Sequence, residues 1–215
     1  TIWHGLEAKD WWDLPKEPRS VTQLSPAGLS YYYGRDLLSS VITRLGEDYG
    51  LRHTHISRDW GIYDHPRYTE LGGWGAYRDF LGRSLVYFNP TKESPMPRSR
   101  TEAMLSGCCI VTTAYQDADK FINFDTRKLW KNSSGLKDFL GKVDKIIDTE
   151  GINGFIIPEN PLVVAGLINY LIYDRFKTAL KIGQEGKKTA QLLFSKKRYD
   201  KEIINLFNKV RERKI

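Results

Sequence analysis

Short apolar runs alternate along this chain with segments of helical spacing. Such runs are typical of strands buried in a sheet, and together with two less apolar segments they predict strands at 20–25, 53–57, 84–88, 108–113 and 154–158. Apolar residues spaced three and four apart predict helices over 36–45, 77–81, 101–106, 136–147, 161–173, 175–193 and after 195. Strands that alternate with helices indicate an α/β fold: a single Rossmann-like domain with a parallel β-sheet and helices on both faces.

The domain is expected to span 1–215 and to carry two appendages. Residues 1–19 form a Trp-rich, irregular lead-in, and residues 174–215 form basic C-terminal helices. Between 175 and 215 there are 13 Lys and Arg against 4 Asp and Glu, whereas the whole chain has a net charge of +7. A basic helical tail can meet an anionic membrane, nucleic acid or an acidic partner, or can be a solvated helix face. Residues 125–142 look like an insertion between two strands.

The cysteines and the absence of long apolar runs suggest a location for the protein. Cys108 and Cys109 are adjacent inside an apolar run, so they cannot cross-link distant segments and are expected to be buried thiols in a reducing compartment. No run approaches the ~20 apolar residues of a membrane span, and no signal-like segment follows Thr1. We therefore expect a cytoplasmic protein, with a peripheral position at a membrane left open. The four histidines lack metal-site spacing, so no metal and no cofactor is predicted.

The stretch from 84 to 113 carries the strongest chemical signal, because a strand leads through a Pro-rich loop into a helix. Ligands of α/β sheets bind at such loops, and the free amides and dipole of a helix N-terminus suit a phosphate. Arg98 and Arg100 would add charge-assisted hydrogen bonds to a diphosphate, and Glu102 is placed to accept hydrogen bonds from ribose hydroxyls. The alternatives are two surface arginines, an ordinary helix acid, and prolines that only shape a turn.

Residues 94–113, SPMPRSRTEAMLSGCCIVTT, resemble the donor-site segment of family 4 glycosyltransferases of the GT-B fold. Residues 151–158, GINGFIIP, resemble the strand that follows in that family, and Thr1-Ile-Trp-His-Gly is similar to the stretch that enters its second domain. The resemblance implies the C-terminal, donor-binding half of a retaining glycosyltransferase of hexosyltransferase type. Such a domain binds a UDP- or GDP-sugar without a metal, and Glu102 would hold the ribose.

The same resemblance implies how the work is divided between domains. The helix N-terminus near Thr101, with Arg98 and Arg100, would stabilise the leaving diphosphate. The acceptor would be held by an N-terminal domain on the same or a separate chain, so this domain alone is expected to show little or no transfer.

Three departures from the family pattern affect the candidate residues. The first acidic residue of the family falls on Ser94, and Glu93 is one position too far. The family's loop glycines are replaced by Pro95, Met96 and Pro97. A tyrosine stands where a diphosphate-binding lysine is usual, so Arg35, or Arg98 with Arg100, could take over that role. Trp60 and Gly61, after the second strand, could lie against the base; the alternative is a tryptophan that covers the edge of the sheet. The candidate catalytic residues are Arg98, Arg100 and Glu93; the candidate nucleotide-sugar contacts are Glu102, Ser94, Pro95, Met96, Pro97, Ser99, Thr101, Trp60, Gly61 and Arg35.

The sequence is also compatible with two other functions. A catalytically silent nucleotide or nucleotide-sugar binding module would use the same residues without transfer. A nucleic-acid-binding protein would bind with an affinity that falls steeply with salt, but the basic residues lie on late helices, away from the aromatic clusters. This separation argues against a base-stacking platform, and no nucleic-acid partner is predicted.

Overall fold

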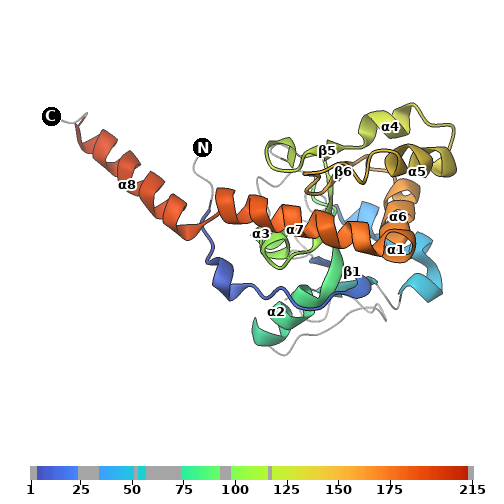
Figure 1. Ribbon diagram of the computed structural model, residues 1–215, viewed down its shortest axis with the longest axis horizontal. Helices are drawn as coiled ribbons and strands as arrows, with labels where there is room; N and C mark the ends of the chain where they lie inside the picture. Colours follow the sequence, from blue (N-terminus) through green and yellow to red (C-terminus); the bar gives the residue numbers. More distant parts are fainter. Residues whose placement is uncertain are drawn as a thin grey trace.

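A six-stranded parallel sheet forms the centre of the protein, as seen in a computed structural model (Figure 1). The structure describes residues 4–23, 34–50, 53–56, 74–92, 98–115 and 118–212. The strand order is β2-β1-β3-β4-β6-β5, and every neighbouring pair is parallel. The strands are β1 (Glu17–Gln23), β2 (His53–Ile56), β3 (Ser84–Asn89), β4 (Cys109–Thr113), β5 (Phe124–Asp125) and β6 (Phe155–Ile157).

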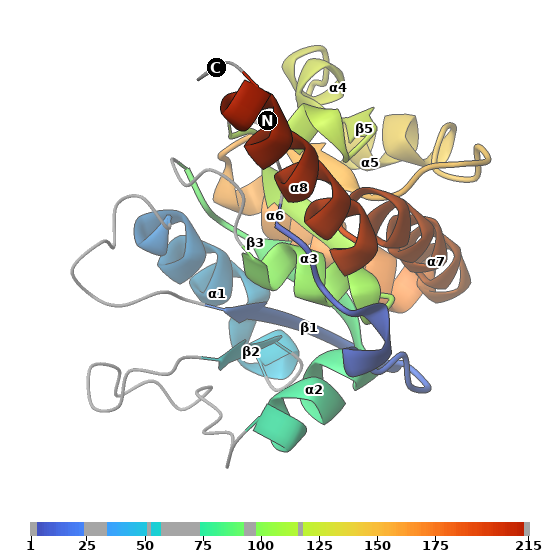
Figure 2. The same ribbon diagram turned by 90° about the vertical axis from the view of Figure 1, so that its left-hand side faces the viewer.

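Eight α-helices and three short helical turns connect and cover these strands in the described part of the chain. The α-helices are α1 (Arg35–Gly50), α2 (Trp74–Arg83), α3 (Arg98–Leu105), α4 (Arg127–Lys131), α5 (Leu136–Asp144), α6 (Pro161–Asn169), α7 (Phe176–Leu193) and α8 (Lys196–Glu212). The turns are η1 (Ala8–Asp10), η3 (Ala118–Lys120) and the π-helical η4 (Tyr170–Asp174). Figure 2 shows helices on both sides of the sheet.

The two faces of the sheet have separate cores, because successive residues of a strand point to opposite faces. In β4, Cys109 and Val111 join a core built with α1, α5 and α6, whereas Ile110 joins a core built with α2, α3 and the end of α7. All of β3, β4 and β6 is buried, which is why these strands were recognisable as apolar runs.

The structure confirms the predicted fold class and corrects three local boundaries. The helix predicted over 101–106 begins three residues earlier, at Arg98, and β1 reaches back into the predicted lead-in as far as Glu17. The predicted insertion at 125–142 is an integral part of the fold: β5 pairs with β6 as an edge strand, and α5 packs on α6. A two-residue strand with one apolar residue, Phe124, is too short to give a periodic signal.

Polar contacts attach the lead-in to the turn after α3 and to α7. The Lys16 ammonium, almost fully buried, donates to the carbonyl oxygens of Gly82 and Ser106, and Asp13 accepts hydrogen bonds from Gln184 and Lys187 of α7 at 2.9 Å each. Burial opposes ionisation of Asp13, but these donors hold its pKa below the usual range. The lead-in therefore contributes to the packing around the turn between α3 and β4.

Candidate functional site

The strand order predicts a ligand-binding crevice outside the carboxyl ends of β1 and β3. The chain runs from β1 to β2 on one side and then returns to β3 on the other, so the connections leave these two strands in opposite directions. Ligands of open α/β sheets bind outside the carboxyl ends of the strands at such a switch point. Gln23 and Asn89 are the last residues of the two strands, and α3 follows β3 directly in the order of elements. The described part of the predicted donor segment, which begins at Arg98, therefore follows one of the two strands at the switch point.

Local geometry fixes both ends of α3 and the approach of α1. The Asn89 side chain accepts a hydrogen bond from the Thr91 amide at 2.9 Å, which turns the chain out of β3. Gly107, at φ 74°, ends α3, and the Gly107 and Cys108 amides donate back to Met104 and Ala103. Gly34, at φ 67°, packs so closely on Pro90 that a Cβ atom would overlap the Pro90 carbonyl. This close contact brings the start of α1, and Arg35 with it, beside the loop after β3.

Glu102 is held by two donors, one on each carboxylate oxygen. The Tyr77 hydroxyl of α2 donates to Glu102 Oε2 at 2.8 Å, and Arg98 Nε lies 3.0 Å from Oε1. The Glu102 side chain is 4% exposed, whereas the Arg98 side chain is 64% exposed. Because α3 begins at Arg98, Glu102 lies beyond the first turn, which weakens its interpretation as an ordinary helix-dipole acid.

Arg100 occupies a different environment from Arg98. Its side chain is fully buried, and the guanidinium lies 3.9 Å from the Phe121 ring centroid and 4.9 Å from that of Tyr115. Stacking on aromatic rings is a common environment for a buried arginine. In this position Arg100 is covered from solvent, so of the two predicted arginines only Arg98 presents its charge at the surface.

Two further predicted residues of α3 turn inward. Thr101 is fully buried, and the Ser99 side chain hydrogen-bonds to Tyr87, whose pKa is raised chiefly by burial. Any contact of Thr101 with a ligand would therefore come through its backbone. The remaining candidates, Glu93, Ser94, Pro95, Met96, Pro97, Trp60 and Gly61, lie outside the described residues.

Two residues near the crevice were absent from the sequence-based site. Tyr77 contacts Glu102 from a helix 25 positions earlier, and no local pattern signals such a contact. His4 stacks on Phe194 at 5.4 Å, and its pKa is lowered to about 4 by burial and then by the charges of Arg98, Arg100 and Arg198. The neutral histidine of the lead-in therefore lies close to arginines of α3 and of the start of α8.

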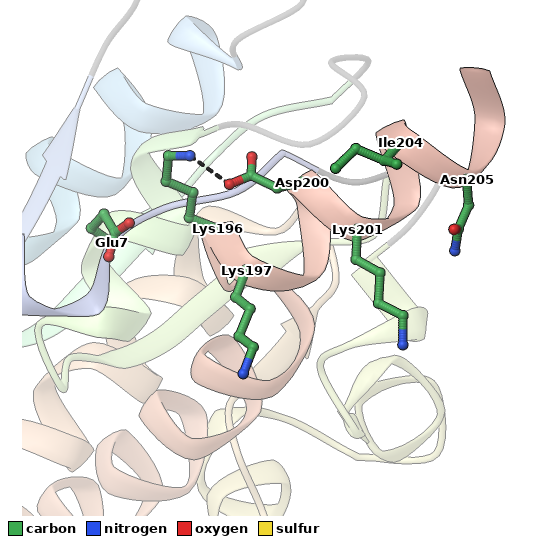
Figure 3. Close-up of a pocket in the computed structure, with 7 residues that line it drawn as sticks. All are labelled: Glu7, Lys196, Lys197, Asp200, Lys201, Ile204 and Asn205. Carbon is green, nitrogen blue, oxygen red and sulfur yellow. Dashed lines mark hydrogen bonds and ion pairs between the residues drawn. The ribbon is translucent and has the colours of Figure 1, made fainter. Parts of the chain in front are cut away.

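A pocket lies at the start of α8, and none of the residues that line it is a predicted contact (Figure 3). It encloses about 440 Å³, and Lys196 pairs with Asp200 at 2.6 Å beside it. Lys197 and Lys201 also line it. Within the described ranges there is no cluster of three or more His, Cys, Asp or Glu suited to a metal ion. No helix of that part of the chain is long and apolar enough to cross a membrane.

The comparisons with known proteins identify the fold. No protein-family model and no curated protein matches the sequence. Among solved structures, Anabaena HepE in complex with UDP-glucose superposes with a TM-score of 0.67 at 16% identity, over 97% of this chain and 57% of HepE. Sucrose-phosphate synthase from Thermosynechococcus elongatus gives 0.67 at 14%, over 97% of this chain and 52% of the synthase.

A third solved structure is a single domain, and this chain covers almost all of it. The C-terminal domain of a glycosyl transferase group 1 family protein (LpcC) from Francisella tularensis gives a TM-score of 0.53 at 12% identity, over 91% of this chain and 97% of that domain. This chain therefore spans little more than half of HepE and of the synthase. At these identities the likeness concerns the fold. The chain has the Rossmann-like fold of the C-terminal half of a GT-B glycosyltransferase, as the sequence predicted.

Proposed function

We propose that this chain is the donor-binding domain of a retaining glycosyltransferase of hexosyltransferase type, with a UDP- or GDP-sugar as donor. The observation that carries the proposal is the Glu102 carboxylate, fixed by Tyr77 and Arg98 one turn into α3, beside the strand switch point. A carboxylate at this kind of position accepts hydrogen bonds from ribose hydroxyls in dinucleotide-binding folds. The structure of HepE with UDP-glucose, which has the same fold, supports the choice of ligand.

In this proposal the protein contributes positioning and charge. The first amides of α3 and the exposed Arg98 face the diphosphate, and Arg35 at the start of α1 adds a second cation beside the Pro90 loop. Arg100, stacked on Phe121, contributes a buried positive charge behind this helix end. Glu93 and the segment 94–97 remain candidates for the sugar side of the site. These groups would stabilise negative charge as the diphosphate leaves, and no step requires a metal.

We further propose that an acceptor-holding domain, on the same or another chain, covers α8. This helix has no buried residue, and Ile204, Leu206, Phe207 and Val210 expose their side chains along it. An apolar stripe flanked by lysines is typical of a surface that meets a partner. An anionic membrane is the alternative partner for this surface. The buried thiols of Cys108 and Cys109, whose pKa values burial raises, accord with a cytoplasmic location.

The second candidate function is a nucleotide or nucleotide-sugar binding module without transfer. The likeness to HepE and to the LpcC domain concerns the fold, which is compatible with this function as well. The two functions share the same binding site. They differ in whether an added acceptor-holding domain produces transfer of the sugar.

Titration calorimetry of the chain with UDP, GDP and ADP tests the binding site. We expect saturable binding of UDP or GDP and a loss of about ten-fold or more in Glu102→Gln, which keeps the shape of the side chain but removes its charge. Asp138→Asn is the matched control, because Asp138 pairs with Lys142 on α5, at the other core. Binding of no nucleotide, or equal binding by wild type and Glu102→Gln, would contradict the proposal.

A further inference from the structure

The lead-in holds the start of α8 through its backbone. Leu6 forms a parallel bridge with Ser195, beside the junction of α7 and α8 (Figure 1). The Leu6 amide donates to the Phe194 carbonyl at 2.7 Å, and the Lys196 amide donates to the Leu6 carbonyl at 3.1 Å. The first amides of a helix have no acceptor within the helix. The lead-in therefore supplies the acceptor for the first amide of α8.

Side chains add to this backbone pairing. The His4 ring stacks on Phe194, with ring centroids 5.4 Å apart. Phe194 is fully buried and meets Phe121 edge to face at 5.8 Å. Leu6 is buried in the same core as these two phenylalanines. The lead-in is thus anchored to the body of the domain at the point where α8 begins.

Gly5 allows the lead-in to lie directly against the first turn of α8. A Cβ atom at Gly5 would lie 2.6 Å from Tyr199 Cβ and 2.9 Å from Lys196 Cα. Carbon atoms in contact prefer a separation of about 3.5–4.0 Å, so this space is already filled. Lys196 Cα belongs to the backbone and cannot turn aside as the end of a side chain can. A larger residue at position 5 must therefore push the lead-in and α8 apart.

We infer that residues 4–7 form a clasp that fixes the direction in which α8 leaves the domain. Beyond its first turn α8 projects from the body, and no residue between 196 and 212 is buried. A helix attached only through its junction with α7 could swing about that junction, whereas a second attachment to the lead-in restricts the swing. The alternative is that the junction alone sets the direction, with the Ser195 side chain capping the Arg198 amide at 3.4 Å.

A fixed direction matters for the partner proposed for α8. A surface that is already oriented before the partner arrives loses less entropy when the two associate. This consequence rests on the proposed function, but the clasp itself does not.

Gly5→Ala tests the clasp with one added methyl group. Because a helix rises ~1.5 Å per residue, a displacement of roughly 1 Å near Tyr199 becomes about 3 Å at Asn208 if α8 turns about Ser195. Spin labels at Lys181→Cys on α7 and Asn208→Cys on α8, both exposed positions, report the distance by double electron–electron resonance. We expect one narrow distance distribution without Gly5→Ala, and a shift of about 3 Å or a clear broadening with it.

A second label pair and a matched variant complete the experiment. A label at the exposed Lys128→Cys on α4, paired with Asn208→Cys, detects a swing that leaves the first distance unchanged. Gly141→Ala adds the same methyl group on α5, where a Cβ atom meets nothing within 4 Å, and both distances should stay the same. Cys108 and Cys109 are buried, so the chain without the introduced cysteines gives the background of labelling.

Each outcome of these measurements decides the inference. A shift or broadening in Gly5→Ala that is absent from Gly141→Ala supports the clasp. Unchanged distances for both label pairs, or equal changes in the two variants, would overturn it. A broad distribution without Gly5→Ala would overturn it as well, because α8 would then not be held in one direction.

Folding and nucleotide binding do not confuse the result. If Gly5→Ala does not fold, as judged by thermal unfolding, His4→Ala takes its place, because it removes the stack on Phe194 without adding an atom. Its distance distributions are then expected to broaden, and unchanged distributions would overturn the inference. No nucleotide is present in these measurements, so the clasp and the proposed function can fail separately.

Discussion

At the scale of single residues, the neighbours of a charged or titratable side chain determine its exposure and its pKa more than the residue type does. Arg98 and Arg100 are two positions apart, yet one is exposed and paired with Glu102 while the other is buried against Phe121. Successive positions of a helix differ by 100°, so two nearby arginines can belong to different surroundings. His4 shows the same principle, because burial and three arginines keep its pKa well below the value of a free histidine.

The pKa of His4 predicts how stability depends on pH. The pKa falls from 6.5 to about 4 on folding, so between these values the unfolded chain binds a proton that the folded chain does not. The contribution of neutral His4 to stability is therefore fully present above pH 6.5 and is lost as the pH falls toward 4. His4→Phe keeps a ring against Phe194 and removes the titration. When the pH is lowered from 7.5 to 4.5, the free energy of unfolding should decrease less in His4→Phe than in wild type. We expect this difference to be on the order of 1 kcal/mol, after allowance for solvent screening.

Urea unfolding at pH 4.5, 5.5 and 7.5 measures this difference. His53, His55 and His65 are present in both proteins, so their contributions cancel in the comparison. Asp13 also stabilises the fold, but its lowered pKa places its loss below this window. Parallel curves for wild type and His4→Phe would show that His4 does not titrate as described.

At the scale of elements, the sequence predicted those segments whose pattern is set by local burial. The strands β3 and β4 are buried throughout, and α6 begins with Pro161 after Asn160, whose side chain caps the Leu162 and Val163 amides. The sequence did not predict the edge strand β5, because two residues are too few to show a periodic pattern of apolar positions. The start of α3 was placed three residues late because its first turn, Arg98 to Arg100, is polar in sequence while Arg100 is buried in space.

The candidate site was predictable only in part for the same reason. The resemblance pointed to Glu102 as the ribose ligand, which remains a prediction, and the structure places Glu102 beside the crevice. The sequence could not predict the contact of Glu102 with Tyr77, because this contact joins two different helices. The aromatic surroundings of Arg100 were out of reach as well, since Tyr115 and Phe121 follow the next strand. A sequence shows which groups are present, and tertiary packing decides which of them meet.

Two helical glycines show how packing between elements depends on missing side chains. A Cβ at Gly183 of α7 would overlap the Gly107 carbonyl, whereas a Cβ at Gly141 of α5 would meet nothing within 4 Å. Gly183→Ala is expected to destabilise the fold by about 1–3 kcal/mol, because α7 would have to move away from the turn before β4. Gly141→Ala is expected to stabilise it by about 0.5–1 kcal/mol, because alanine favours the helix.

Urea unfolding of the two variants at pH 7.5 gives both values, and each variant serves as the control for the other. Both substitutions add one methyl group within a helix, so propensity alone predicts the same sign. Stabilisation by Gly183→Ala would mean that α7 and the Gly107 turn are not in close contact.

At the scale of the whole molecule, α8 is the element whose position the domain itself does not explain. It projects from the body in Figure 1, and no residue of it is buried. By contrast, α7, immediately before it, buries residues against α3, β3 and β4. Helices in water are stabilised mainly by packing of an apolar face. The open apolar face of this helix therefore accords with the partner proposed for it above.

The exposed apolar stripe predicts that substitutions on α8 change association with a partner without changing the stability of the domain. The double variant Ile204→Gln, Phe207→Gln replaces side chains that are 58% and 69% exposed, so the free energy of unfolding of the domain should change by less than about 0.5 kcal/mol. Nucleotide binding measured by calorimetry should also be unchanged, because α8 lies outside the crevice. Sedimentation velocity should show less self-association than wild type, since exposed apolar patches associate.

Vesicles containing phosphatidylserine distinguish the two partners proposed for this helix. If α8 serves a protein domain, wild type and the double variant should cosediment with the vesicles equally little at 0.15 M salt. The helix also carries Lys201, Lys209 and Arg211, so binding to an anionic bilayer would need these charges together with insertion of Phe207. Binding by wild type that the double variant loses would therefore place α8 on a membrane. Transfer activity restored by an acceptor-holding domain, and lost in the double variant, would place it between the two domains.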